Sequence, residues 1–164
     1  MQRLHPVVVG LVFVTACAAN EEVETTFDPC SPLEIVVTSD HVEDVEAVKA
    51  ALAAWARVVP VGDVAVTPGT PAAGQLTVRF LDGEQPVRGM YYDSVGLVEI
   101  SRDMLAPEVY PIAVAHELGH AFGLLHVEAS TRASVMNVGN TTVGPTEQDA
   151  IEVIAKWASC RAAP

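Results

Sequence analysis

The eleven residues from 116 to 126 carry three histidines and a glutamate at spacings that suit a metal site. They read His-Glu-Leu-Gly-His-Ala-Phe-Gly-Leu-Leu-His. On a helix, His116 and His120 leave the same face about one turn apart, so both imidazoles can bind one metal ion. Glu117 follows the first ligand, where its carboxylate can take a proton from a water on the metal. The spacing H-E-x-x-H therefore predicts a zinc site with Glu117 as general base.

The rest of this stretch predicts a third ligand. Gly123 lies one turn after the second histidine, where helices commonly end at a residue with left-handed backbone. A turn there would bring His126 back to the metal. Three protein ligands leave a fourth position open, which is the arrangement of catalytic zinc. The alternative is an amphipathic helix with surface histidines. Against it, an apolar face is already available without the histidines, from Leu118, Ala121, Phe122 and Leu125.

These eleven residues resemble the extended zinc-binding helix of the metzincins, a clan of zinc endopeptidases. The clan also has a turn that carries a methionine beneath the metal, and Ser-Val-Met-Asn at 134–137 lies where that turn is expected. The resemblance implies that Met136 packs under the ligands without binding the metal; an ordinary loop methionine is the alternative. The short layout and Thr-Glu-Gln-Asp-Ala-Ile at 146–151 resemble the matrixins most. The resemblance covers about residues 33–160.

The hydrophobic patterns predict five strands and three helices. Strands are expected at 33–38, 64–67, 75–81, 88–94 and 96–101. An amphipathic helix is expected at 40–58, with a capping-box start at Asp40 and Glu43. The zinc-site helix should start between Pro107 and Pro111, and a last helix should start near Thr146. We therefore expect an α+β, zincin-like (metzincin) catalytic domain: a twisted mixed five-stranded sheet with one antiparallel edge strand and three helices.

The resemblance also implies where substrate binds. In the clan, the fourth strand is an antiparallel edge strand that borders the cleft, and substrate pairs with it by strand addition. Residues 89–93 occupy that place here, although an ordinary half-exposed edge strand is the alternative. The segment 137–145 should line the pocket for the residue after the scissile bond. The substrate-binding residues implied are Gly89, Met90, Tyr91, Tyr92, Asn137, Val138 and Gly139.

The sequence departs from the matrixins in its expected metal content. Matrixins carry a long loop between the third and fourth strands, which holds a structural zinc and calcium. Here that connection is only residues 82–87, so we expect one catalytic zinc and no second one, and calcium is not indicated. Val138 stands two residues after Met136, so a tyrosine ligand of the astacin or serralysin type is not expected.

The N-terminus has the features of an export signal. An apolar core at 7–14 is too short to span a bilayer and suits a signal peptide. Val-Thr-Ala-Cys at 14–17 resembles the bacterial lipobox, which implies that residues 1–16 are removed and that Cys17 is lipidated. Ala18 after the cysteine implies sorting to the outer membrane, facing the periplasm or the cell surface. The alternative is an ordinary secretory signal cleaved near Ala19.

Two cysteines remain in the exported chain. We interpret residues 17–32 as an acidic tether and residues 33–164 as the catalytic domain. In an exported protein, Cys30 and Cys160 are expected to pair. The resemblance supports this pairing, because the N-terminal segment of matrixins packs near the last helix. The competing hypothesis is that Cys30 is a thiolate on the zinc, as in matrixin propeptides.

Composition limits the classes of partner. The chain has 164 residues, half of them hydrophobic, and a formal net charge of −12. One compact domain is expected, and nucleic acid is not, because no basic patch can neutralise phosphates. We expect a monomeric zinc endopeptidase with a protein or peptide substrate, held at a membrane by lipid on Cys17. The alternatives are a surface binding protein on an inactivated metzincin scaffold, and a zinc hydrolase of a non-protein amide.

Overall fold

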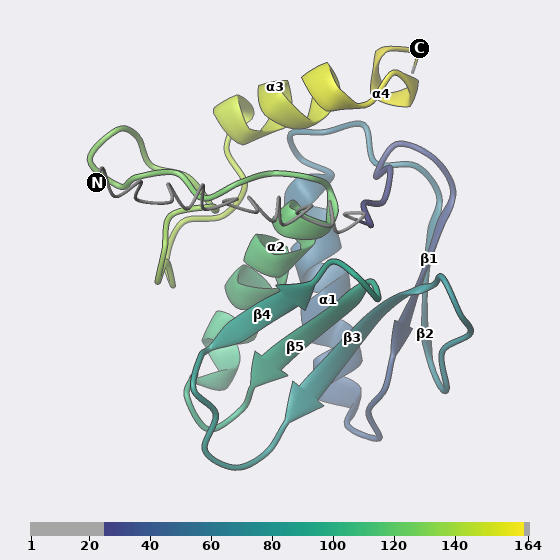
Figure 1. The fold of residues 1–164 in the computed structure, drawn as a ribbon, viewed down its shortest axis with the longest axis vertical. Helices are drawn as coiled ribbons and strands as arrows, with labels where there is room; N and C mark the ends of the chain where they lie inside the picture. The colour runs from purple at the N-terminus through teal and green to yellow at the C-terminus, as the bar shows by residue number, and fades with distance from the viewer. Residues whose placement is uncertain (1–24, 163–164) are drawn as a thin grey trace, which may run out of the picture.

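The computed structural model describes residues 25–162, which form a layered α+β domain (Figure 1). The expected signal peptide and the lipidation site at Cys17 lie outside the described residues. The elements are β1 (Leu33–Val37), α1 (Val42–Trp55), β2 (Val64–Pro68), β3 (Leu76–Leu81), β4 (Gly89–Tyr92), β5 (Leu97–Ser101), η1 (Pro107–Val109), α2 (Tyr110–Ala121), α3 (Glu147–Lys156) and α4 (Ser159–Ala162). In this part of the chain, no helix is long and apolar enough to cross a membrane.

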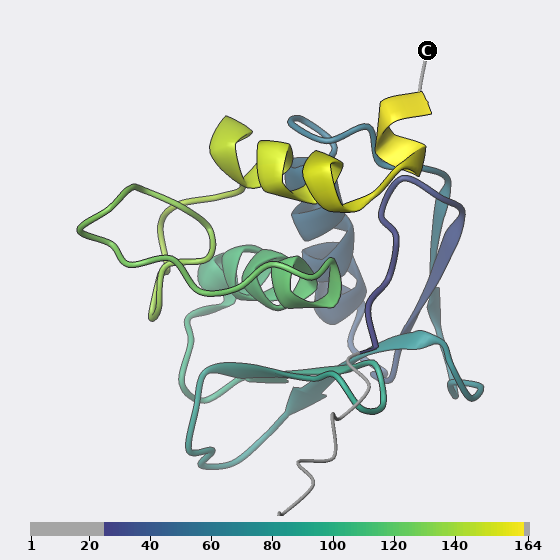
Figure 2. The same ribbon diagram turned by 45° about the horizontal axis from the view of Figure 1, so that its top comes forward.

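The five strands form one mixed sheet in the order β2-β1-β3-β5-β4. Strands β2, β1, β3 and β5 are parallel to one another, whereas β4 lies antiparallel beside β5 at one edge. Helices α1 and α2 lie on the same side of the sheet, with α3 beyond them (Figure 2). The predicted fold class is therefore confirmed, including the antiparallel edge strand.

The core between the sheet and the helices fixes the position of α2. Trp55 at the end of α1 is fully buried, as expected for a core residue. Its indole Nε1 donates to the carbonyl oxygen of Ala115 at 3.0 Å, and its ring meets Phe122 edge to face at 5.6 Å. The N–H of a buried tryptophan usually has a hydrogen-bond partner, and here the partner is the backbone of α2. This contact joins the end of α1 to the middle of α2.

The start of α1 differs from the prediction. The helix begins after His41 with no side-chain cap, so the expected capping box at Asp40 and Glu43 is wrong. The polar group that organises this end is Asp44, whose side chain is fully buried. Asp44 accepts hydrogen bonds from Ser39 and Arg102, and Arg102 comes directly after β5. A long-range ion pair therefore replaces the local cap.

The last long helix, α3, starts with a capping box formed by Thr146 and Asp149. Ile151 is 57% exposed, whereas Val153 is fully buried. The chain leaves the helix at Trp157 in an extended conformation, so Cys160 lies in the separate short helix α4.

The described part of the N-terminal segment packs on the domain. The backbone N–H of Phe27 donates to Ala121 at the end of α2, at 2.8 Å. Cys30 is joined to Cys160 by a disulfide, which confirms the expected pairing. A disulfide and backbone hydrogen bonds therefore hold residues 25–32 on the domain, within the segment 17–32 that we interpret as an acidic tether.

Candidate metal centre

The turn after α2 brings the third histidine back to the first two. Helix α2 follows a short 3₁₀ turn and has a proline in its first turn, as predicted. At its other end, Gly123 has φ +88°, and its N–H donates to the carbonyl of His120 at 2.8 Å. Left-handed backbone reverses the chain here at little cost because glycine has no Cβ. The reversed chain then carries His126 over the face of α2.

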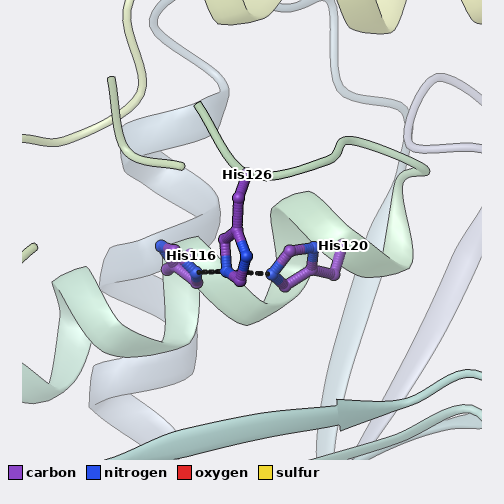
Figure 3. A group of neighbouring side chains, drawn as sticks. All are labelled: His116, His120 and His126. Carbon is purple, nitrogen blue, oxygen red and sulfur yellow. Dashed lines mark hydrogen bonds between the residues drawn. The ribbon is translucent and has the colours of Figure 1, made fainter. Parts of the chain in front are cut away.

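The three imidazoles converge through the same ring atom (Figure 3). His126 Nε2 lies 3.2 Å from His116 Nε2 and 3.2 Å from His120 Nε2. Nitrogens bound to tetrahedral zinc at about 2.0–2.1 Å would be about 3.3 Å apart. The spacing of the ring nitrogens thus suits a small cation held between them.

The hydrogen bonds of Nδ1 determine the tautomers of His116 and His120. His116 Nδ1 lies 2.6 Å from the carbonyl oxygen of Val135, and His120 Nδ1 lies 2.9 Å from that of Leu124. A carbonyl oxygen can only accept, so each Nδ1 carries the proton. Each Nε2 therefore presents a lone pair to the centre, which is the form that binds zinc.

Burial favours the neutral form of the first ligand. The pKa of His116 is lowered to about 4, mainly by burial; the hydrogen bond to Val135 acts in the opposite direction, and the neighbouring His120 and His126 add to the lowering. A neutral imidazole at ordinary pH has its Nε2 lone pair available. The donor set, its tautomers and its spacing therefore fit a zinc ion.

Glu117 is buried against the edge strand and is only 7% exposed. A Cβ built on Gly89 would lie 2.7 Å from Glu117 Oε1, so the carboxylate approaches β4 where glycine leaves room. Burial raises the pKa of Glu117 to about 8, although a hydrogen bond from the backbone of Tyr91 acts in the opposite direction. Glu117 is thus a more basic carboxylate than an exposed one, held beside the backbone of β4.

Met136 lies in the core directly beneath α2. Its side chain is fully buried, and a Cβ on Gly119 would overlap its sulfur. The loop that carries it is joined to the chain after His126 by a short parallel bridge, with Val127 N donating to Met136 O at 3.0 Å. The methionine therefore packs beneath the helix that carries His116 and His120.

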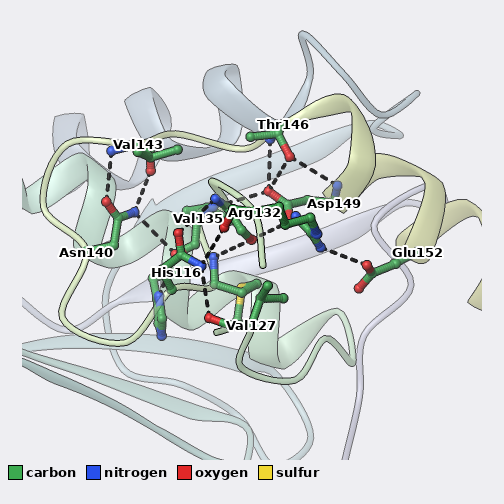
Figure 4. A network of polar contacts seen from close by, with 12 residues as sticks. His116, Val127, Arg132, Val135, Asn140, Val143, Thr146, Asp149 and Glu152 are labelled. Carbon is green, nitrogen blue, oxygen red and sulfur yellow. Dashed lines mark hydrogen bonds and ion pairs between the residues drawn. The ribbon is translucent and has the colours of Figure 1, made fainter. Parts of the chain in front are cut away.

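A buried carboxylate organises the loop around Met136 (Figure 4). Asp149, at the start of α3, is fully buried. It accepts hydrogen bonds from Ser134 Oγ at 2.5 Å and Val135 N at 3.2 Å. It also pairs with Arg132 at 2.6 Å and completes the capping box with Thr146. Asp149 thus joins the start of α3 to the two residues before Met136.

The histidines and Glu117 lie in a cleft of about 550 Å³. Much of its wall is apolar. Several lining side chains are exposed to solvent although they are large and hydrophobic: Val87, Met90, Met104, Leu125 and Val138. An apolar cleft with a few convergent polar groups is the usual form of a ligand site.

Five of the seven residues expected to bind substrate line this cleft: Gly89, Met90, Tyr91, Val138 and Gly139. Tyr92 does not; its side chain lies beside Glu99 of β5 instead. Asn137 does not either, because its amide is buried and bonded to Ser134 N, Val127 O and Arg132 O. The expected substrate contacts are therefore corrected at these two positions.

Sequence reasoning placed Asn140 in the cleft-lining segment 137–145, but it missed Arg132. Asn140 lines the cleft, and its amide donates to the carbonyls of Val135 and Val143. The local pattern of asparagines and glycines at 137–144 indicated a turn, which is the available signal for such a residue. Arg132 has no comparable local signal, since its partner Asp149 lies on α3. The disulfide also excludes Cys30 as a thiolate ligand.

No protein-family model and no curated protein matches the chain. Among solved structures, it is similar to the structure of myroilysin, with 17% sequence identity and a TM-score of 0.44. The match covers 62% of this chain and 52% of that chain, so the chain spans about half the length of that protein. A likeness of this size carries no information about chemistry.

Proposed function

We propose that this chain is a zinc-dependent endopeptidase, built on a metzincin-like catalytic domain closest in layout to the matrixins. The observation that carries the proposal is the convergence of three imidazole Nε2 atoms in the cleft that also holds the buried Glu117. A structural zinc site is usually closed by four protein ligands. Three ligands beside a basic carboxylate suit hydrolysis instead.

Zinc held by His116, His120 and His126 would act as a Lewis acid, polarising a substrate carbonyl and making a water more acidic. The proton transfers are carried out by a residue of the chain. Glu117 takes the proton of the attacking water and passes it to the leaving amine. Its buried position makes it a stronger base than an exposed glutamate, and the backbone of β4 holds it in place.

The edge strand orients the substrate. Strand β4 is paired on one side only, with β5, and its residues Gly89, Met90 and Tyr91 line the cleft. An extended peptide can add to such an edge through main-chain hydrogen bonds. Val138 and Gly139 contribute the loop part of the same lining, and the apolar wall keeps water away from the bound peptide.

We further propose that the protein is exported and anchored to the outer membrane by lipid on Cys17. The support is the sequence of residues 1–18, with its apolar core and lipobox-like end. Cells grown with labelled fatty acid should incorporate the label into this chain. The Cys17→Ser variant should not be labelled, and label that persists in this variant would overturn the proposal.

The catalytic proposal is tested with purified protein. We expect one zinc per chain, and cleavage of an unfolded protein substrate that a chelator abolishes and added zinc restores. Glu117→Ala should keep zinc and lose activity, whereas Glu108→Ala removes an exposed glutamate outside the cleft lining and serves as the matched control. Zinc binding without cleavage of any peptide library would favour a binding protein or a hydrolase of a non-protein amide.

A further inference from the structure

The two ends of the edge strand carry opposite charges. Arg88 comes directly before β4 and Asp93 follows directly after it, and both line the cleft. Arg88 is the single lysine or arginine among the described residues of that lining. The chain as a whole has a formal charge of −12. A positive group in this cleft is therefore a local exception to the surrounding negative charge.

Arg88 is held at the rim but keeps most of its hydrogen-bonding capacity. Its guanidinium donates to the carbonyl of Gly139 at 3.3 Å, which ties it to the loop after Met136. A guanidinium has five N–H donors in a planar fork that matches a carboxylate. In the part of the chain that the structure describes, no acidic side chain forms an ion pair with Arg88.

Asp93 is fixed by its backbone while its carboxylate has no basic partner among residues 25–162. Its carbonyl accepts from Thr25 N at 3.2 Å, and the Tyr91 hydroxyl donates to Thr25 O at 2.5 Å. These contacts hold the turn after β4 against the N-terminal segment. The backbone that carries the Asp93 carboxylate is thus held in place at the cleft wall.

The proposed general base lies between these two charges. The Glu117 carboxylate approaches Gly89 and accepts from the backbone of Tyr91, so it faces the middle of β4. A strand advances about 3.3 Å per residue. A peptide extended along β4 would therefore meet Arg88 and Asp93 within about three residues of the bond that Glu117 serves.

We propose that the cleft selects extended peptides with an acidic side chain on one side of the scissile bond and a basic side chain on the other. The proposal rests on the proposed peptidase function and adds its charge specificity. One charge order places opposite charges together at both ends of β4, and the reverse order places like charges together. Exposed ion pairs change affinity by about two- to fivefold each, so two such pairs should make the two orders differ about four- to 25-fold in kcat/KM.

The test uses three quenched fluorescent peptides that differ only in charge. One has Glu and Lys two positions from the scissile bond on opposite sides, the second has them exchanged, and the third has Gln at both places. Wild type should prefer one charge order, and the preference should fade in 1 M salt, where the Debye length is about 3 Å. Equal kcat/KM for the two orders at low salt overturns the proposal.

Variants of Arg88 and Asp93 test whether these residues cause the preference for one charge order. Arg88→Gln should reduce the ratio between the two orders about two- to fivefold, and Arg88→Glu should reduce it further; Asp93→Asn should also reduce it. Arg57→Gln removes the same charge from an exposed site outside the cleft lining and is the matched control. The same loss of preference in Arg57→Gln would show a general charge effect and would overturn the assignment to Arg88.

Failure of this inference differs from failure of the peptidase function. Cleavage of the neutral peptide without any order preference would overturn the charge selection and leave the peptidase intact. Cleavage of none of the three peptides would count against the peptidase. Fluorescence anisotropy of the same peptides with zinc-loaded wild type would then measure selection directly, and equal Kd values for the two orders would overturn it.

Discussion

Asp149 is linked to His116 through one residue, Val135. The backbone N–H of Val135 donates to the Asp149 carboxylate, and its carbonyl accepts from His116 Nδ1. The carboxylate is fully buried on α3, and the imidazole is the first proposed zinc ligand. Groups that orient a metal-bound histidine commonly change metal affinity 10- to 100-fold when removed. Here the backbone of Val135 orients His116, and the Asp149 carboxylate holds the backbone of Val135.

Asp149→Asn should therefore weaken zinc binding. The variant keeps the size of the side chain but loses the charge that pairs with Arg132. We expect a zinc Kd raised about tenfold or more and a free energy of unfolding reduced by about 1–3 kcal/mol. Chelator competition, performed at a temperature where both proteins are folded, measures the first effect, and urea unfolding measures the second.

Glu152→Gln is the control for this variant. Glu152 also accepts a hydrogen bond from Arg132, and it is partly exposed. Among the described contacts, Glu152 accepts no hydrogen bond from Ser134 or Val135, which donate to Asp149. Zinc binding should change little in Glu152→Gln. If both variants weakened zinc binding equally, the effect would belong to Arg132 and not to the link through Val135.

Asp149 should also shape stability at acid pH. Burial alone would raise its pKa, but hydrogen bonds from Ser134, Arg132 and Thr146 outweigh that effect and hold the pKa below its usual value of 3.8. A carboxyl with a lowered folded pKa stabilises the native state above its unfolded pKa, and this contribution is lost as pH falls through the folded pKa.

The measurement is urea unfolding of wild type and Asp149→Asn from pH 6 to pH 2.5. The difference in free energy of unfolding should be constant above about pH 5 and should shrink below the usual pKa of the carboxyl. Some acid sensitivity should remain in the variant, because the pKa of Asp28 is also lowered, against burial, by hydrogen bonds from Ser159, Cys30 and Ser31. A constant difference down to pH 2.5 would contradict the assignment.

Local patterns predicted the five strands, the three longer helices and the convergence of the histidines, but not the start of α1 or the short helix α4. The i, i+4 spacing of His116 and His120 is a property of any helix, and Gly123 marks the reversal that returns His126. The edge position of β4 came from resemblance to a family and not from its residues. What these predictions share is that they depend on short-range geometry or on the order of elements.

Side chains paired across the fold could not be predicted in the same way. Arg132 and Asp149 are 17 residues apart and belong to a loop and a helix, and no local pattern links them. Asn137 looked like a cleft residue because it follows Met136, yet its amide is hydrogen-bonded to three backbone groups. Ile151 and Val153 are both apolar, and only the packing of α3 decides which of them is buried.

Gly89→Ala should reduce catalysis by displacing the proposed base. The added Cβ would lie 2.7 Å from Glu117 Oε1, so the carboxylate or the strand must shift. Misplacement of a reacting group by about 1 Å can cost 100-fold in rate. We expect kcat to fall about 10- to 100-fold while zinc stoichiometry is kept. Steady-state kinetics that separate kcat from KM, with metal analysis of the same samples, measure this.

Gly144→Ala is the matched glycine variant, because a Cβ at that position meets no atom within 4 Å. It should behave as wild type in the same assay. A Gly89→Ala enzyme with normal kcat would show that the close approach of Glu117 to β4 has no part in the reaction.

The Cys30–Cys160 disulfide should contribute strongly to stability. It joins positions 130 residues apart, so it restricts most of the unfolded chain, and removal of a native disulfide typically costs about 2–5 kcal/mol. The double variant Cys30→Ser with Cys160→Ser should lose about this much free energy of unfolding in oxidising buffer. Wild type in reducing buffer should lose a similar amount, whereas the double variant should not respond to reductant. Zinc binding at low temperature should persist, because the disulfide lies outside the ligand set. Equal stability of wild type and variant in oxidising buffer would contradict this expectation.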